Sequence, residues 1–182
     1  MDRDALEAAR RGESWALEAI YRELAPQVLG YLRGQGVRDS EDAASEVFVG
    51  MVRGLKRFRG DDRDFRTWVF SIAHRRVIDE RRRLARRREE PVEPLDLAGP
   101  LAGSRTGDAE AEGLDRLGTR WALAALSTLS PDQRAVVALR VLADLSVEQV
   151  AAVLGKSLGA VKSLQRRGLA ALARNLEREG VS

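Results

Sequence analysis

Aromatic rings and arginines are concentrated in one short segment, FRTWVFSIAHRR, at residues 65–76. It contains three of the nine aromatic residues, the single histidine and the first arginines of a basic run. Aromatic faces stack on unpaired bases and guanidinium groups neutralise phosphates, so the combination is typical of a surface for single-stranded nucleic acid. Extruding a base costs on the order of a few kcal/mol, which requires a site preformed on a rigid element.

The rigid element predicted here is a helix, because apolar residues recur at steps of three and four. The stripe consists of Phe65, Trp68, Val69, Ile72, Ala73 and Val77, and we expect Asp64 to cap it. A core role accounts for Trp68 and Ile72. The residues that cannot all lie on the same buried stripe are Phe65, Phe70, His74, Arg75 and Arg76. A lone histidine without companions at metal-ligand spacing favours a hydrogen-bonding surface residue over a ligand or proton donor.

Charge is segregated along the chain, although the net charge is only +3. Residues 75–88 contain eight arginines and two acids, and residues 89–118 contain eight acids and two arginines. A local basic surface attracts polyanions even on a nearly neutral chain. The absence of cysteine excludes disulfides and thiolate metal sites. No apolar run approaches the roughly 20 residues of a membrane span, and the charged N-terminus argues against export.

Three segments are expected in the 182 residues: a helical domain at 1–88, a linker at 89–118 and a second helical domain at 119–182. The middle segment holds three of the five prolines and five glycines, with no apolar period. We interpret it as a mobile acidic linker, with an ordered surface loop as the alternative. No segment alternates as a strand, so the predicted fold is all-α.

The second domain has the pattern of a helix-turn-helix. Capping boxes begin at Ser130 and Ser146, and Gly155 supplies the left-handed residue of the turn. The next helix begins near Ser157 and directs Val161 and Leu164 inward. Its exposed residues, Lys162, Ser163, Arg166 and Arg167, suit phosphates and base edges in a major groove. A three-helix bundle with a solvated basic face is the alternative.

Residues 39–83, from DSEDAASEVF to VIDERRR, resemble region 2 of bacterial sigma factors, and residues 126–172, from LSTLSPDQ to GLAAL, resemble their region 4. The resemblance covers roughly residues 15–88 and 119–176. The short length and the missing region 3 point to the extracytoplasmic-function (ECF) group of the sigma-70 family.

The resemblance implies a transcription initiation factor with two DNA-reading surfaces. The helix that begins near Ser40 would dock on the clamp helices of core RNA polymerase through Asp42, Glu46 and Phe48. Reading and melting of the −10 region would fall to Arg59, Phe65, Arg66, Trp68, His74, Arg75, Asp79 and Arg82, with Trp68 structural. Reading of the −35 region would fall to Ser157, Lys162, Ser163, Arg166 and Arg167.

The implied partners are core RNA polymerase, promoter DNA as duplex and melted strand, and an anti-sigma factor. The resemblance implies a cytoplasmic, nucleoid-associated bacterial protein that is not inserted in a membrane, is not an enzyme and uses no cofactor or metal. The linker would be either a mimic of nucleic acid in the active-site channel or a plain tether.

Two other classes remain. A stand-alone helix-turn-helix regulator would use the second domain alone and would not need Asp42, Glu46, Phe48 or the aromatic-basic helix. A metal-dependent nuclease requires clustered carboxylates. Asp61, Asp62 and Asp64 are adjacent, but they fall in a predicted turn beside arginine.

Overall fold

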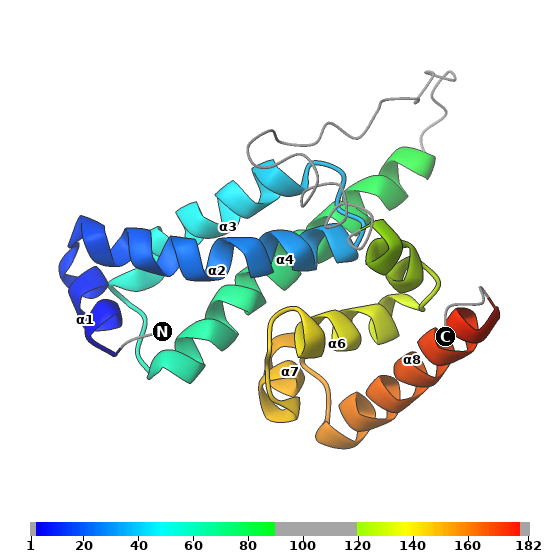
Figure 1. Ribbon diagram of the computed structural model, residues 1–182. Helices are drawn as coiled ribbons and strands as arrows, with labels where there is room; N and C mark the ends of the chain where they lie inside the picture. The colour runs from blue at the N-terminus through cyan, green and yellow to red at the C-terminus, as the bar shows by residue number, and fades with distance from the viewer. Residues whose placement is uncertain (1–2, 90–119, 179–182) are drawn as a thin grey trace, which may run out of the picture.

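A computed structural model describes residues 3–89 and 120–178, and every regular element in these ranges is a helix (Figure 1). The N-terminal half contains α1 (Arg3–Arg11), α2 (Ser14–Gly34), α3 (Ser40–Leu55) and α4 (Asp62–Glu89). The C-terminal half contains helical residues 120–127, α6 (Pro131–Val141), α7 (Val147–Leu154) and α8 (Leu158–Arg178). The all-α prediction is confirmed. Of the predicted linker, only Glu89 lies within the described residues. None of the described helices combines the length and apolarity that crossing a membrane demands.

The long helix α4 is capped by Asp61 and not by Asp64. Oδ1 of Asp61 accepts hydrogen bonds from the backbone N–H groups of Arg63 and Asp64 at 2.9 and 3.0 Å. Asp64 Oδ2 accepts in return from the Asp61 N–H at 3.2 Å. The expectation that Asp64 is the cap was therefore wrong by three residues, because Asp64 is the returning member of a reciprocal pair.

The turn and caps of the helix-turn-helix are confirmed. Ser130 with Gln133 and Ser146 with Gln149 each form both hydrogen bonds of a capping box. Gly155 ends α7 in the left-handed conformation, at φ +62° and ψ 34°, where a side chain would be strained. Sequence-local hydrogen bonds thus fix where α6, α7 and α8 begin.

Two glycines allow helices to approach closely within each half. At Gly54 of α3, a Cβ would lie 2.6 Å from Cζ2 of Trp68 on α4. At Gly168 of α8, a Cβ would lie 2.8 Å from Cγ2 of Val137 on α6. Both distances are shorter than any ordinary carbon–carbon contact, so the glycines set the packing distance of α3 on α4 and of α8 on α6.

The two halves pack against each other. Most of their buried apolar side chains form one cluster, with α7 against α4 and α6 against α2 (Figure 1), and a smaller cluster of Leu126, Leu129 and Val137 lies within the C-terminal half. Gly34 of α2 faces the C-terminal half, since a Cβ there would lie 3.1 Å from Cδ1 of Leu126 and 3.7 Å from Cδ1 of Leu142. The helix-turn-helix is therefore held in a defined position relative to α4.

Candidate nucleic-acid interface

The first turns of α8 carry the residues predicted to read duplex DNA. Ser157 precedes the helix, and its Oγ accepts a hydrogen bond from the Ala160 N–H at 3.3 Å. Lys162, Arg166 and Arg167 are exposed, and Ser163 is half-buried. Lys162 and Arg166 are four residues apart, as are Ser163 and Arg167, so the four side chains form two adjacent rows on α8. The structure therefore gathers the predicted −35 residues into one basic surface, which we call the α8 face.

Buried neighbours hold the α8 face in place. Val161 is fully buried and Leu164 packs against the same core. Lys156, in the turn before α8, forms an ion pair with Asp132 of α6 at 2.9 Å. The side chains that orient α8 are thus separate from the cations that it exposes.

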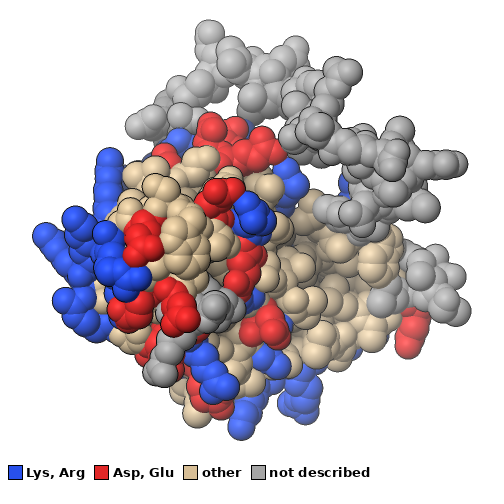
Figure 2. Space-filling model, turned by 60° about the vertical axis from the view of Figure 1, so that its left-hand side comes forward, with Lys and Arg blue, Asp and Glu red and all other residues tan. Residues whose placement is uncertain are grey.

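On α4, the outward residues of the predicted −10 set are Arg75, Asp79 and Arg82. All three are exposed, and Asp79 and Arg82 line a surface hollow with Ala85 and Arg86. Figure 2 shows the side of the molecule that lies at the left in Figure 1. Lys and Arg side chains gather along its left edge, and Asp and Glu side chains lie nearer its centre. A polyanion would meet a mixed surface there.

Phe65 does not present its ring to solvent. Its exposed fraction is 0%, and the ring packs against both Phe58 and Trp68, with centroid distances of 5.4 and 5.7 Å. Phe70 is also fully buried, edge to face with Tyr31 at 6.0 Å. The expectation that Phe65 and Phe70 offer faces to unstacked bases is corrected, because both rings are buried in the core. Trp68 is half-buried and stacks on Phe58 at 5.0 Å, as a structural residue would.

Arg59 and Arg66 both bond to backbone carbonyls, but in different surroundings. Arg59 is exposed, and its guanidinium donates to the carbonyls of Lys56 and Phe58, each at 2.9 Å. Arg66 is half-buried and points to the C-terminal half, where its Nε donates to the Ala143 carbonyl at 2.9 Å. It also donates to Gln27 and, at 3.5 Å, to Glu23. Arg66 is therefore occupied by the protein itself in this conformation.

His74 is half-buried, with Nδ1 2.8 Å from the Tyr31 hydroxyl. Burial, followed by the positive charge of Arg81, lowers the pKa of His74, while Asp132 opposes this and Lys156 adds to it. Burial raises the pKa of Tyr31, so its hydroxyl keeps its proton and can donate to the neutral ring. His74 is thus a half-buried, hydrogen-bonded residue and does not occupy an exposed position of α4.

The predicted polymerase-docking residues divide between surface and core. Asp42 and Glu46 are exposed on α3, and Glu46 pairs with Arg76 of α4 at 2.6 Å. Phe48 is only 7% exposed and meets the ring of Tyr21 at 4.7 Å. Phe48 therefore cannot itself be a contact residue in this conformation.

Exposed apolar residues near Phe48 were missed by sequence reasoning. Tyr21 is 54% exposed, and Val49 and Val52 are each 47% exposed. Val49 lies off the buried stripe of α3, and this was the signal that could have identified it, whereas sequence periodicity placed Val52, four residues after Phe48, on the buried face. Together with Asp42 and Glu46 they give α3 an exposed surface that is both apolar and acidic.

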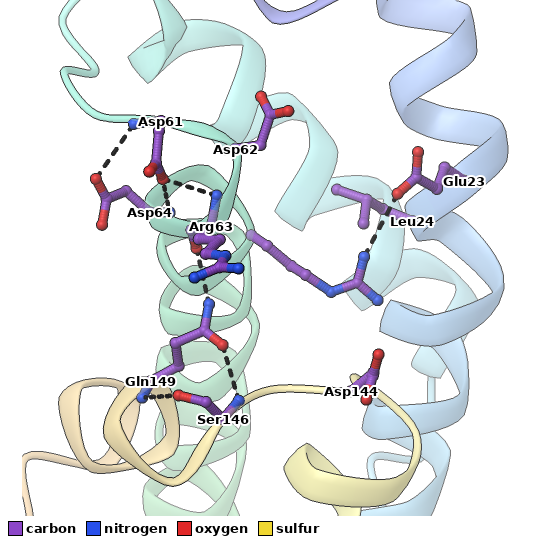
Figure 3. A pocket seen from close by; sticks show the side chains of 10 residues that line it. Glu23, Leu24, Asp61, Asp62, Arg63, Asp64, Asp144, Ser146 and Gln149 are labelled. Carbon is purple, nitrogen blue, oxygen red and sulfur yellow. Dashed lines mark hydrogen bonds and ion pairs between the residues drawn. The ribbon is translucent and has the colours of Figure 1, made fainter. Parts of the chain in front are cut away.

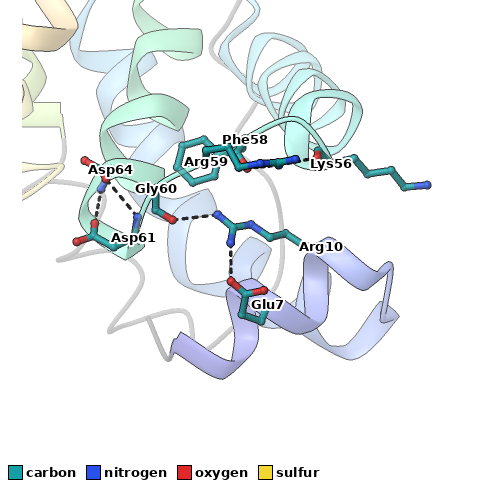
Figure 4. A network of polar contacts seen from close by, with 8 residues as sticks. All are labelled: Glu7, Arg10, Lys56, Phe58, Arg59, Gly60, Asp61 and Asp64. Carbon is teal, nitrogen blue, oxygen red and sulfur yellow. Dashed lines mark hydrogen bonds and ion pairs between the residues drawn. The ribbon is translucent and has the colours of Figure 1, made fainter.

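A second missed residue is Arg10, which ties α1 to the loop before α4 (Figure 4). Its guanidinium donates to the Gly60 carbonyl at 2.9 Å, pairs with Glu7, and lies 5.5 Å from the centre of the Phe58 ring. Gly60 has φ +143°, and a Cβ there would lie 2.6 Å from Cβ of Asp64. The loop that carries Arg59 is therefore fixed from outside by α1.

A cavity of about 650 Å³ lies between the halves, and five of its ten lining residues are acidic (Figure 3). The lining residues are Glu23, Leu24, Asp61, Asp62, Arg63, Asp64, Arg66, Asp144, Ser146 and Gln149. Asp144 has φ +49°, a conformation that aspartate tolerates better than most residues. Within residues 3–89 and 120–178, no group of three or more histidine and carboxylate side chains suits a metal ion. Asp61 and Asp64 instead serve the cap of α4.

Comparisons with known proteins agree on one family. Residues 20–87 match the model of sigma-70 region 2, and residues 119–172 match that of sigma-70 region 4. The chain is 34% identical over 175 residues to the ECF RNA polymerase sigma factor BldN of Streptomyces coelicolor, covering 95% of this chain and 65% of that protein. It is 31% identical to the ECF RNA polymerase sigma factor ShbA of Streptomyces griseus, covering 90% and 89%.

A solved structure shares the fold. It is CnrH in complex with the cytosolic domain of CnrY, with a TM-score of 0.69, 23% identity and 97% of each chain covered. The likeness extends over the N-terminal helices and the helix-turn-helix together.

Proposed function

The chain belongs to the sigma-70 family of RNA polymerase sigma factors, in its ECF group, and we propose that it binds core RNA polymerase and directs it to specific promoters. In this role it reads the −35 and −10 elements and helps to open the DNA, while the polymerase performs the catalysis. It acts in the cytoplasm, at the nucleoid, and an anti-sigma factor holds it inactive.

The α8 face is the observation that carries this proposal. Lys162, Arg166 and Arg167 are exposed on α8. This helix follows the turn at Gly155, and its opposite face packs on the core, so its position is fixed. Such a helix fits the major groove, where arginine bonds to guanine edges and lysine to phosphates. The −35 element is therefore read by α8.

The N-terminal half supplies polymerase docking and the −10 contacts. Asp42 and Glu46, with the exposed apolar residues of α3, form the docking surface. Arg59, Arg75, Asp79 and Arg82 remain at the surface as −10 contacts, whereas Phe65 and Trp68 support them from the core. Arg66 and His74 can reach DNA only if the C-terminal half moves away from α4.

A reconstitution tests the proposal. Purified protein is mixed with bacterial core RNA polymerase and genomic DNA from its host, and the 5′ ends of the transcripts are sequenced. Discrete starts that depend on the protein and share paired upstream elements are expected. If no start depends on it while the protein alone still shifts duplex DNA, it is a stand-alone regulator and the proposal is wrong.

A further inference from the structure

Gln149 joins the two halves with the side-chain amide that also caps α7. Its Oε1 accepts from the Ser146 N–H at 2.7 Å, which completes the capping box. Its Nε2 donates to the Arg63 carbonyl (Figure 3) and to Thr67 Oγ1, each at 3.0 Å. The two ends of one amide thus serve different purposes: the oxygen starts a helix of the C-terminal half, and the nitrogen binds the first turns of α4.

Arg66 forms the reciprocal contact from α4. Its Nε donates to the Ala143 carbonyl, and its other two nitrogens donate to Gln27 and Glu23 of α2. Hydrogen bonds therefore run in both directions between one stretch of α4 and the segment 143–149. We call Gln149, Thr67, Arg66 and the Ala143 carbonyl the interdomain clasp.

Apolar burial adds to the clasp. Leu145 and Val150, on either side of the capping box, are fully buried and belong to the cluster shared by both halves. Moving α7 away from α4 would expose part of this cluster to water, which disfavours separation. The arrangement in which α7 packs on α4, called closed below, is therefore stabilised both by the hydrogen bonds of the clasp and by the burial of apolar surface.

The closed arrangement is incompatible with nucleic acid at the start of α4. Each guanidinium nitrogen of Arg66 already donates to a protein acceptor, and the adjoining cavity is lined by five carboxylates against the two cations Arg63 and Arg66. Carboxylates repel phosphates at close range. A DNA strand would have to replace the segment 143–149 to reach Arg66.

We propose that the start of α4 is the docking surface for the chain's own α7, and that the interdomain clasp keeps the free protein closed until promoter engagement. Gln149 is the positioning residue of this surface. The inference rests on the proposed function, because the start of α4 matters for DNA only if the chain reads promoters.

Gln149→Glu tests the clasp with the capping box intact. Glutamate still accepts the Ser146 N–H, since S-x-x-E is itself a capping box, but it has no N–H to donate to Thr67 or the Arg63 carbonyl. Gln133→Glu is the matched control, because Gln133 completes the same box in α6 and lies against α8. Both variants should retain their helix content.

The separation of the halves can be measured without polymerase or DNA. Because the natural chain has no cysteine, Ser45→Cys on α3 and Ala173→Cys on α8 provide two unique labelling sites for single-molecule energy transfer. Both positions are exposed. Gln149→Glu should raise the ratio of open to closed molecules about tenfold, as loss of two hydrogen bonds implies, and Gln133→Glu should leave it unchanged. Equal ratios in the two variants would overturn the clasp, whatever the chain does in transcription.

A reversible cross-link tests the masking of α4. Thr67→Cys with Gln149→Cys is joined by a short, reducible bifunctional thiol reagent, and transcription with core polymerase is measured before and after reduction. The joined form should lose promoter-dependent transcripts and regain them on reduction. Joining Thr128→Cys to Asn175→Cys, which are both in the C-terminal half and outside the α8 face, should cause no loss. Transcription by the joined interdomain form would refute masking, whereas only failure of the unaltered chain to support promoter-dependent transcription would refute the proposed function.

Discussion

The Tyr31 hydroxyl lies 2.8 Å from Nδ1 of His74, and this pair joins α2 to α4. The charged groups that act on the His74 ring are Arg81 on α4, Asp132 on α6 and Lys156 in the turn before α8. Burial and Arg81 lower its pKa below the usual 6.5. The folded protein therefore favours the neutral ring.

Stability is expected to fall as the pH drops below 6.5. The unfolded chain protonates His74 near that value while the folded chain resists protonation, so the unfolded state binds more protons. The contribution is complete above pH 6.5 and is lost as the pH falls toward the lowered pKa of the folded state. Urea unfolding between about pH 8 and pH 5.5 measures it, because His74 is the only histidine. His74→Gln should flatten the profile, and an unchanged slope would contradict this assignment.

Phe65→Ala should lower the stability of the protein, and it should have no separate effect on promoter opening. Because the ring is fully buried against Phe58 and Trp68, its removal should lower the free energy of unfolding by about 3–5 kcal/mol. Chemical denaturation gives the value directly. A variant of normal stability with a selective defect in promoter opening would instead restore Phe65 as a base contact.

Gly54→Ala should be destabilising although alanine favours helices. The new methyl group would meet the Trp68 ring at 2.6 Å, and that ring is backed by Phe58, so overpacking of about 1–3 kcal/mol is expected. Gly50→Ala on the same helix is the control. Its nearest neighbour would be Cγ2 of Ile72 at 3.5 Å, an ordinary contact, so helix propensity should stabilise it by up to about 1 kcal/mol. Urea unfolding of both variants should give changes of opposite sign.

Arg10→Met should loosen the loop before α4. The change keeps an apolar stem but removes the donor to the Gly60 carbonyl and the cation over Phe58. A loss of about 1–2 kcal/mol in the free energy of unfolding is expected, together with faster amide exchange in residues 56–61. Arg11→Met, which removes an exposed cation paired with Glu13, should change stability by less than about 0.5 kcal/mol. Equal effects would mean that the loop does not depend on α1.

Arg166→Ala should weaken selection of the −35 sequence by about 1–3 kcal/mol if its guanidinium reads a base. Binding to matched and mismatched promoters, measured over a range of salt concentrations, separates the possibilities. Equal loss on all sequences with a reduced salt slope would make Arg166 a phosphate contact. Arg174→Ala, also exposed but farther along α8, is the control and should change neither quantity.

Local features of the fold could be predicted because their causes are local. The boxes at Ser130 and Ser146 and the left-handed Gly155 depend on hydrogen bonds within four residues, and the structure confirms all three. The cap of α4 was misplaced because DDRD offers three neighbouring carboxylates. Their sequence alone does not reveal which one remains outside the helix.

The site was harder to predict because burial of α4 comes from more than one direction. A single stripe would leave Phe70 exposed, but Tyr31 of α2 covers it. Similarly, the box motif predicts the use of Gln149 Oε1, whereas the partner of its Nε2 lies 82 residues away on Thr67. Such contacts depend on how separate segments pack together, and this packing cannot be predicted from the periodicity within one segment.

The apolar cluster shared by the two halves has a consequence for cooperativity. Heat or denaturant should unfold both halves in one transition, because most of the buried apolar side chains of the two halves belong to one shared cluster. Cleavage of the peptide chain between residues 89 and 120 should likewise yield two fragments that remain associated and co-purify. The two fragments would then behave as a split protein that reassembles by complementation. The covalent connection would raise the effective concentration of one half near the other, but it would not determine the folded structure.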